Sequence, residues 1–202
     1  YFLAKRAEGP CLVIAERIDE IRDFLRSEGL DGQFHPSYTR MVPAHHIVEL
    51  NLVGCPDPNP QNTRFFEPER NRLGTDLAYI GAVANEVDRW LDRIDSSEPI
   101  GVLFSGGIDS GGVFLTVYHC LLKRGESPAR LKAFCLTVDG QSADAEQARR
   151  FLDELDLGMF LETVDVPLSA LDYREAIRVI EDYKPLDVQS ATVALALCRG
   201  IR

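Results

Sequence analysis

The alternation of helical and strand patterns after residue 76 constrains the fold of this chain more than any other feature. Apolar residues recur at helical spacing over 76–94, and a continuous apolar run follows at 100–104. Helices are then predicted at 110–124, 142–155, 169–182 and 188–199, with strands at 131–138 and 160–166. This order predicts an α/β domain built on a doubly wound parallel sheet, with its ligand site at the carboxyl ends of the strands. We expect the strand at 100–104 to be buried on both faces.

The residues before this region follow a different pattern. An apolar run at 11–15 predicts a strand, 17–26 a helix, and the alternation at 46–53 another strand. Three prolines at 54–60 and the charged, turn-forming residues at 67–75 interrupt the chain. We place a boundary near residue 68. It divides the chain into a partial, mostly β segment (1–68) and the α/β domain (69–202).

Composition restricts the class of partner. The 202 residues carry a net charge of −10, which disfavours the broad basic surface that binds nucleic-acid backbones. No apolar run approaches the roughly 18 residues of a membrane span. The five cysteines form no CxxC pair, as is typical of reduced thiols in a cytoplasmic protein. We therefore expect a cytoplasmic protein that acts on small molecules, with neither nucleic-acid nor membrane partners.

A glycine-rich turn directly follows the apolar run at 100–104. Its sequence is Ser105-Gly106-Gly107-Ile108-Asp109-Ser110. Glycines permit positive φ and a close approach of the backbone to a ligand, and amides at a helix start converge on an anion. The two serine hydroxyls add donors. Asp109 would repel a bare phosphate, so it indicates Mg²⁺ between the carboxylate and a pyrophosphate.

Two other phosphate-binding loops do not match this turn. A Walker A loop ends in Gly-Lys-Ser/Thr, whereas here Gly112 is followed by Val113. The dinucleotide fingerprint G-x-G-x-x-G does not fit either. The remaining alternative is a plain strand-to-helix turn whose Asp or Ser caps the helix.

The turn resembles the SGGxDS signature of the PP-loop ATP pyrophosphatases, and the chain as a whole is most similar to the asparagine synthetase group. Residues 12–16 resemble a segment late in that group's class II glutamine amidotransferase domain. Residues 41–45, with 65–68 after them, resemble its Pro-Gly-His strand and the following segment, although Ala44 replaces the usual glycine. Residues 133–137 and 180–183 resemble, in order, the strand that contacts adenine and the helix before the next loop.

The resemblance implies ATP and Mg²⁺ as cofactors, with Asp109 as the metal ligand. The expected nucleotide contacts are Leu103, Ser105, Gly106, Gly107, Asp109, Ser110 and Leu136. Catalytic residues are not identified. Family members begin with a catalytic cysteine and carry a second loop, Ser-Gly-x-Gly-x-Asp-Glu, whereas this chain begins at Tyr1 and ends at Arg202. We therefore expect it to be an interior piece of a longer enzyme, inactive by itself.

The implied reaction is the adenylation of a carboxylate by ATP, followed by transfer of the acyl group to ammonia or an amine. Asparagine made from aspartate is the default product, but a β-lactam-type ring closure or the amidation of another acid would use the same loop. Two alternatives stay open: a tRNA-modifying PP-loop enzyme, and a non-catalytic remnant of the synthetase fold. Class II amidotransferase synthetases are often dimers, so a homodimer is a further expectation.

Overall fold

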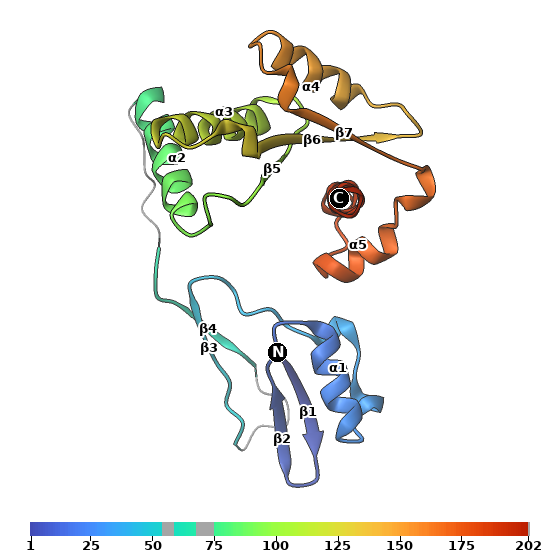
Figure 1. Cartoon of the computed structure of the whole chain (residues 1–202). Coiled ribbons are helices and arrows are strands. Elements are labelled where there is room, and N and C mark those ends of the chain that lie inside the picture. Colours follow the sequence, from blue (N-terminus) through green and yellow to red (C-terminus); the bar gives the residue numbers. More distant parts are fainter. Residues whose placement is uncertain (54–58, 68–74, 202) are drawn as a thin grey trace. The chain divides into compact units, whose positions relative to one another are not determined.

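The computed structural model describes residues 1–53, 59–67 and 75–201 (Figure 1). The chain divides into two units, Tyr1–Asn71 and Arg72–Arg202. The boundary predicted near residue 68 and most of the proline-rich break at 54–60 fall outside the described residues. The assignment of the first unit to an amidotransferase-like domain stays a prediction.

The first unit has its core under a β-hairpin. Strands β1 (Phe2–Arg6) and β2 (Gly9–Val13) pair antiparallel, and helix α1 (Ile18–Ser27) packs against them. The buried side chains of this core are Phe2, Ala4, Val13, Ile21 and Leu25. A second antiparallel pair joins β3 (His46–Glu49) to β4 (Gln61–Arg64).

Two strands of this unit were not predicted. All four residues of β4, Gln-Asn-Thr-Arg, are exposed, so this strand carries no apolar alternation to detect. Strand β1 contains two charged residues among its five, and its pairing with β2 brings Phe2 and Ala4 into the core. Pairing with a neighbouring strand, rather than local composition, defines both elements.

The second unit alternates helices and strands. Its elements are α2 (Asp76–Leu91), β5 (Ile100–Leu103), α3 (Ile108–Lys123), β6 (Leu131–Val138), α4 (Ala143–Asp153), β7 (Leu161–Val166), α5 (Tyr173–Ile180) and α6 (Pro185–Gly200). The strands form a parallel sheet in the order β5-β6-β7. The α/β class with a parallel sheet is thereby confirmed. Within the described ranges, the helices are too short or too polar to span a bilayer.

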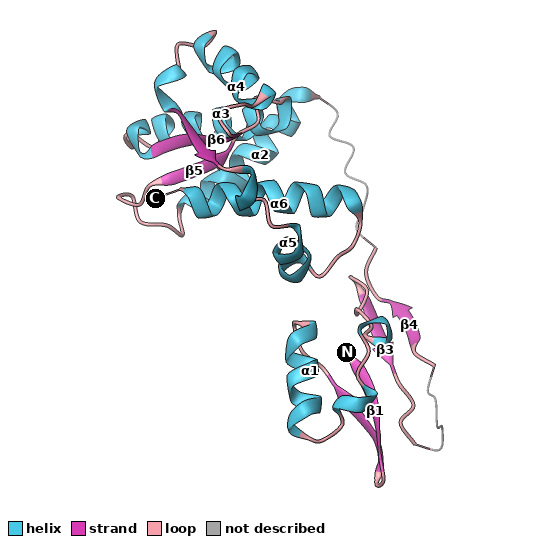
Figure 2. Cartoon of the chain, turned by 90° about the vertical axis from the view of Figure 1, so that its right-hand side faces the viewer, coloured by secondary structure: helices cyan, strands magenta, loops and turns pink. Residues whose placement is uncertain are grey.

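Helices cover both faces of the sheet, as Figures 1 and 2 show for α4 and α6. Strand β6 directs Ala133 and Cys135 towards a core shared with α3 and α4, whereas Phe134 and Leu136 meet Leu197 of α6 on the other face. This alternation is the side-chain period of a strand covered on both sides. The doubly wound PP-loop arrangement stays a prediction.

Strand β5 differs from the prediction that it is buried on both faces. Ile100 and Val102 are buried, but Leu103 is 44% exposed and Gly101 is also exposed. In the described part of the chain β5 pairs only with β6, so it lies at the edge of the sheet. An added Cβ at Gly101 would lie 3.0 Å from Cε2 of Phe134, so the phenyl ring takes the room that a side chain would need. The apolar run at 100–104 therefore predicted burial wrongly for the face of β5 that carries Gly101 and Leu103.

Helices α5 and α6 are joined by a carboxylate with two arginine partners. Glu175 of α5 accepts hydrogen bonds from Arg178 and from Arg199 of α6, the latter at 3.1 Å between Nη2 and Oε1. These bonds, chiefly the two from Arg178, lower the pKa of Glu175 to about 2 from its ordinary value of 4.5. The depressed pKa means that ionised Glu175 stabilises the folded state above about pH 4.5, and that this contribution is lost between pH 4.5 and 2.

Glu175→Gln is accordingly expected to lower the unfolding free energy at neutral pH. The effect should be smaller near pH 3, because the stabilising contribution of the wild-type carboxylate is partly lost at that pH. Denaturant unfolding of both forms at several pH values measures the difference. A difference in unfolding free energy that stays constant from pH 7 to pH 3 would contradict the assignment.

Candidate phosphate loop and nucleotide cleft

The glycine-rich turn lies between the end of β5 and the start of α3. Gly106 has φ +74°, and a Cβ built on it would lie 2.5 Å from the backbone nitrogen of Ala148 in α4. Gly107 has an ordinary φ of −76°, and its Cβ would meet only Ser105 Oγ, at 3.4 Å. The positive φ that we expected of the glycines is therefore found at Gly106 and not at Gly107. Backbone conformation and packing both require glycine at Gly106.

Hydroxyl groups and amides gather inside this turn. The amide of Ser105 donates to Ser110 Oγ at 3.3 Å, and the amide of Gly107 donates to Ser105 Oγ at 3.4 Å. Ser110 Oγ in turn donates to the carbonyl of Gly107 at 3.2 Å. The amides of Ile108 and Asp109 open α3 and have no acceptor within the helix. The turn thus places several donors at the positive end of a 16-residue helix, an arrangement suited to an anion.

A cleft of about 520 Å³ lies at the carboxyl ends of β5 and β6. It is lined by Leu103, Phe104, Ser105, Cys135, Leu136, Val138, Gln141, Ser142, Asp144, Leu186, Gln189, Ser190, Val193, Ala194 and Leu197. Three of the predicted contacts, Leu103, Ser105 and Leu136, therefore share one cavity. Small-molecule sites usually measure roughly 300–1,000 Å³, so the cleft has the size of a ligand site.

Asp109 and Ser110 line a different hollow. This groove of about 610 Å³ follows the edge of β5 and is bordered by α2, including Trp90. Leu103 borders both the groove and the cleft. The structure therefore places the predicted residues around the end of β5, but it does not bring all of them into a single cavity.

Asp109 was predicted to hold Mg²⁺. Over the described ranges, no group of three or more His, Cys, Asp or Glu side chains could hold a metal ion. Magnesium is commonly held by one or two carboxylates, with phosphate oxygens and water completing its shell. The exposed carboxylate of Asp109, in the first turn of α3, fits that kind of site and not a cage made of protein alone.

Helix α6 supplies a wall of the cleft that sequence reasoning did not identify. Leu186, Gln189, Ser190 and Val193 lie at spacings of three and four residues, so they form one stripe on this helix. The apolar members stay accessible: Leu186 is 72% exposed and Val193 is 46% exposed. The spacing is visible in the sequence, but nothing local shows which face of the helix covers a ligand site.

Cys135 also lines the cleft, from the buried centre of β6. Burial raises the pKa of its thiol, and the nearby charge of Asp144 adds to the effect. A thiol with a raised pKa stays protonated at neutral pH and is a poor nucleophile. We therefore assign Cys135 to the wall of the cleft and not to a nucleophilic role.

Comparison with known families supports the interpretation of this region. The family model described as asparagine synthase matches residues 84–202, which contain the turn, the sheet and the α6 wall. A comparison with curated proteins gives no match. Because the family match covers more than half of the 202 residues, the chain belongs to the asparagine synthase family.

Proposed function

We propose that this chain binds ATP between the cleft and the turn and carries the adenylation site of an ATP-dependent amide-forming synthetase. The observation that carries the proposal is the position of the turn. Ser105 belongs both to the donor-rich turn and to the cleft that contains Leu136. A pyrophosphate at the turn could therefore be continuous with a nucleoside in the cleft. Membership of the asparagine synthase family supports a ligase of this type.

The chain's own groups account for part of the chemistry. A substrate carboxylate attacks the α-phosphorus of ATP, the bond to the pyrophosphate oxygen breaks, and an acyl-adenylate forms. The amides of Gly107 and the α3 start, with the hydroxyls of Ser105 and Ser110, stabilise the negative charge that develops on the leaving pyrophosphate. Mg²⁺ at Asp109 would neutralise part of the same charge. An amine then attacks the acyl carbon, AMP leaves, and the nitrogen loses a proton.

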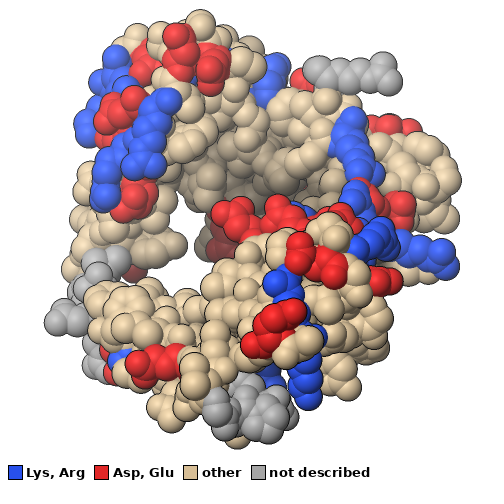
Figure 3. Space-filling model, turned by 90° about the horizontal axis from the view of Figure 1, so that it is seen from below, with Lys and Arg blue, Asp and Glu red and all other residues tan. Residues whose placement is uncertain are grey.

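The preferred substrate is aspartate, which would give asparagine. Other carboxylates are the alternative substrates for the same amide-forming reaction. A tRNA substrate is less compatible with the surface. On the face drawn in Figure 3, basic side chains lie in small groups beside acidic ones. The chain as a whole carries a net charge of −10. A nucleic-acid backbone is normally bound by a continuous basic surface.

The test is ATP–pyrophosphate exchange in the full-length protein, measured with aspartate and with other carboxylates. We expect exchange that depends on the carboxylate, together with calorimetric binding of pyrophosphate and ATP to residues 1–202. If the wild-type chain binds neither pyrophosphate nor ATP, the proposal is overturned.

Asp109→Asn is expected to slow exchange in the full-length protein at least tenfold, because metal clamps on phosphate groups contribute several kcal/mol. The matched control is Asp76→Asn, which removes a carboxylate from the first turn of α2 instead. Both changes remove a favourable helix-dipole interaction, of roughly 0.3–1 kcal/mol. Only the change at Asp109 should weaken the dependence of exchange on Mg²⁺. A rate within twofold of wild type would contradict the assignment.

A further inference from the structure

A single side chain of α4 is hydrogen-bonded to the backbone of the phosphate loop. Nε2 of Gln147 donates to the carbonyl oxygen of Gly106 at 2.9 Å, and the two residues are 41 positions apart in sequence. The bond is partly buried, so it is less exposed to competition from water than a surface contact.

This bond determines which way the next amide points. The Gly106 carbonyl and the Gly107 N–H belong to one peptide unit, and no described peptide bond is cis. In a trans unit these two groups point in opposite directions. Holding the carbonyl against α4 therefore turns the Gly107 N–H away from α4, into the turn, where it donates to Ser105 Oγ at 3.4 Å.

Among the described residues, the peptide between the two glycines is otherwise held by the long 3.4 Å bond from the Gly107 amide to Ser105 Oγ. Rotation of this unit changes ψ of Gly106 and φ of Gly107, and neither residue has a Cβ that would restrict the rotation. Helix α4, by contrast, is held firmly beside the loop. Added Cβ atoms would lie 2.5 Å from the nitrogen of Ala148 at Gly106 and 2.7 Å from Cζ of Phe151 at Gly111. Gln147 thus projects from a fixed support onto the most rotatable peptide of the turn.

We propose that Gln147 is a positioning residue, which holds the Gly106–Gly107 peptide so that the Gly107 amide faces the bound pyrophosphate. It acts through the backbone and need not touch the ligand. This inference rests on the proposed function of the same loop. It predicts that loss of the side-chain donor weakens the binding of phosphate-bearing ligands and leaves the nucleoside part unaffected.

The test compares Gln147→Met, which keeps the length of the side chain but removes the donor, with Gln147→Glu. We expect either change to weaken pyrophosphate and ATP binding to residues 1–202 about fivefold, in keeping with one lost hydrogen bond. Adenosine affinity should not change. The ¹⁵N–¹H signal of Gly107 should shift in both variants without ligand. Below about pH 4 the introduced carboxyl is protonated and regains a donor, so Gln147→Glu should approach wild type measured at the same pH.

The matched control is Gln33→Met in the first unit. Nε2 of this exposed side chain donates to the carbonyl of Lys5 at 2.8 Å, and Oε1 accepts from the Lys5 amide, so Gln33 also holds a backbone segment, but one outside the loop. This control should leave pyrophosphate affinity unchanged. If wild type binds pyrophosphate and both Gln147 variants bind it equally well, the positioning role is overturned and the adenylation proposal stands. If wild type binds neither pyrophosphate nor ATP, the adenylation proposal itself fails.

Discussion

Gly106→Ala is expected to lower the unfolding free energy of the second unit by roughly 3 kcal/mol and to abolish measurable pyrophosphate binding. A left-handed conformation costs a non-glycine residue about 1–2 kcal/mol, and Gly106 has φ +74°. Forcing an extra carbon into a packed site costs a further 1–3 kcal/mol or so. The new Cβ would lie 2.5 Å from the nitrogen and 2.7 Å from the Cα of Ala148, and these backbone atoms cannot move aside as a flexible side chain can. The turn would have to shift.

The matched control is Gly112→Ala, six residues further along the chain. Gly112 lies inside α3, and an added Cβ there would have no described atom within 4 Å apart from the backbone of its own helix. Replacing a helical glycine with alanine stabilises a helix by about 1 kcal/mol. The two substitutions should therefore change stability in opposite directions in denaturant unfolding. A loss of less than about 0.5 kcal/mol for Gly106→Ala, within the scatter of ordinary surface substitutions, would show that the loop adapts easily.

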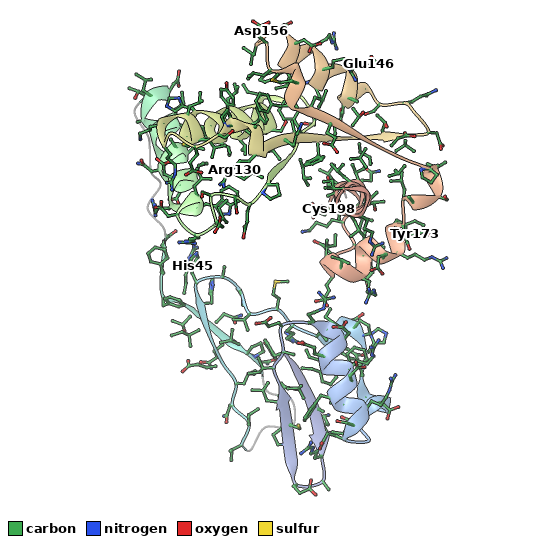
Figure 4. All side chains as sticks on the ribbon, viewed as in Figure 1. His45, Arg130, Glu146, Asp156, Tyr173 and Cys198 are labelled. Carbon is green, nitrogen blue, oxygen red and sulfur yellow. The ribbon has the colours of Figure 1, made fainter. Side chains whose placement is uncertain are left out.

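Arg130→Met is expected to lower the unfolding free energy by about 2 kcal/mol, because it removes the charge beside one oxygen of the mostly buried Glu126 carboxylate, whose other oxygen keeps Arg124. The side chain of Arg130, labelled in Figure 4, is 9% exposed and that of Glu126 is 19% exposed. Nη1 of Arg130 donates to the carbonyl of Asp95 at 2.8 Å, and Nη2 lies 3.5 Å from Oε2 of Glu126. In the described structure Oε2 has no hydrogen-bond partner, so the contact with Arg130 is its compensation, whereas Oε1 accepts from Nε of Arg124 at 2.7 Å.

The double change Arg130→Met with Glu126→Met tests this explanation. Removing both charges avoids the uncompensated carboxylate oxygen, and Arg124 keeps its 2.8 Å bond to Asp92, so most of the lost stability should return. Arg22→Met serves as the exposed control, since the side chains of Arg22 and Asp23 are 46% and 60% exposed. The loss of unfolding free energy in Arg22→Met should stay below about 1 kcal/mol. A double variant as unstable as Arg130→Met alone would show that the loss comes from packing or from the bond to Asp95.

The sequence by itself determined the elements of the α/β unit. The strand predicted at 131–138 is β6 with the same bounds, and the strand predicted at 160–166 is β7, Leu161–Val166. The five helices from α2 to α6 were likewise found near their predicted ranges. Hydrophobic periodicity is a local property that a run of residues carries with it, so these elements could be recognised without their neighbours. The turn at Ser105 was recognised for the same reason, because its residues are contiguous.

Only the tertiary structure decided what surrounds the turn. In the structure one face of β5 is exposed, Asp109 lies outside the cleft that Leu136 lines, and α6 forms a wall of that cleft. The tertiary structure also brings Gln147 to the carbonyl of Gly106 across 41 positions. Contacts of this kind depend on how whole elements pack, and a local pattern carries no information about which distant side chain will meet it. The residues of the turn that we propose to bind the anion could therefore be identified from sequence, whereas Gln147 and the α6 wall of the cleft could not.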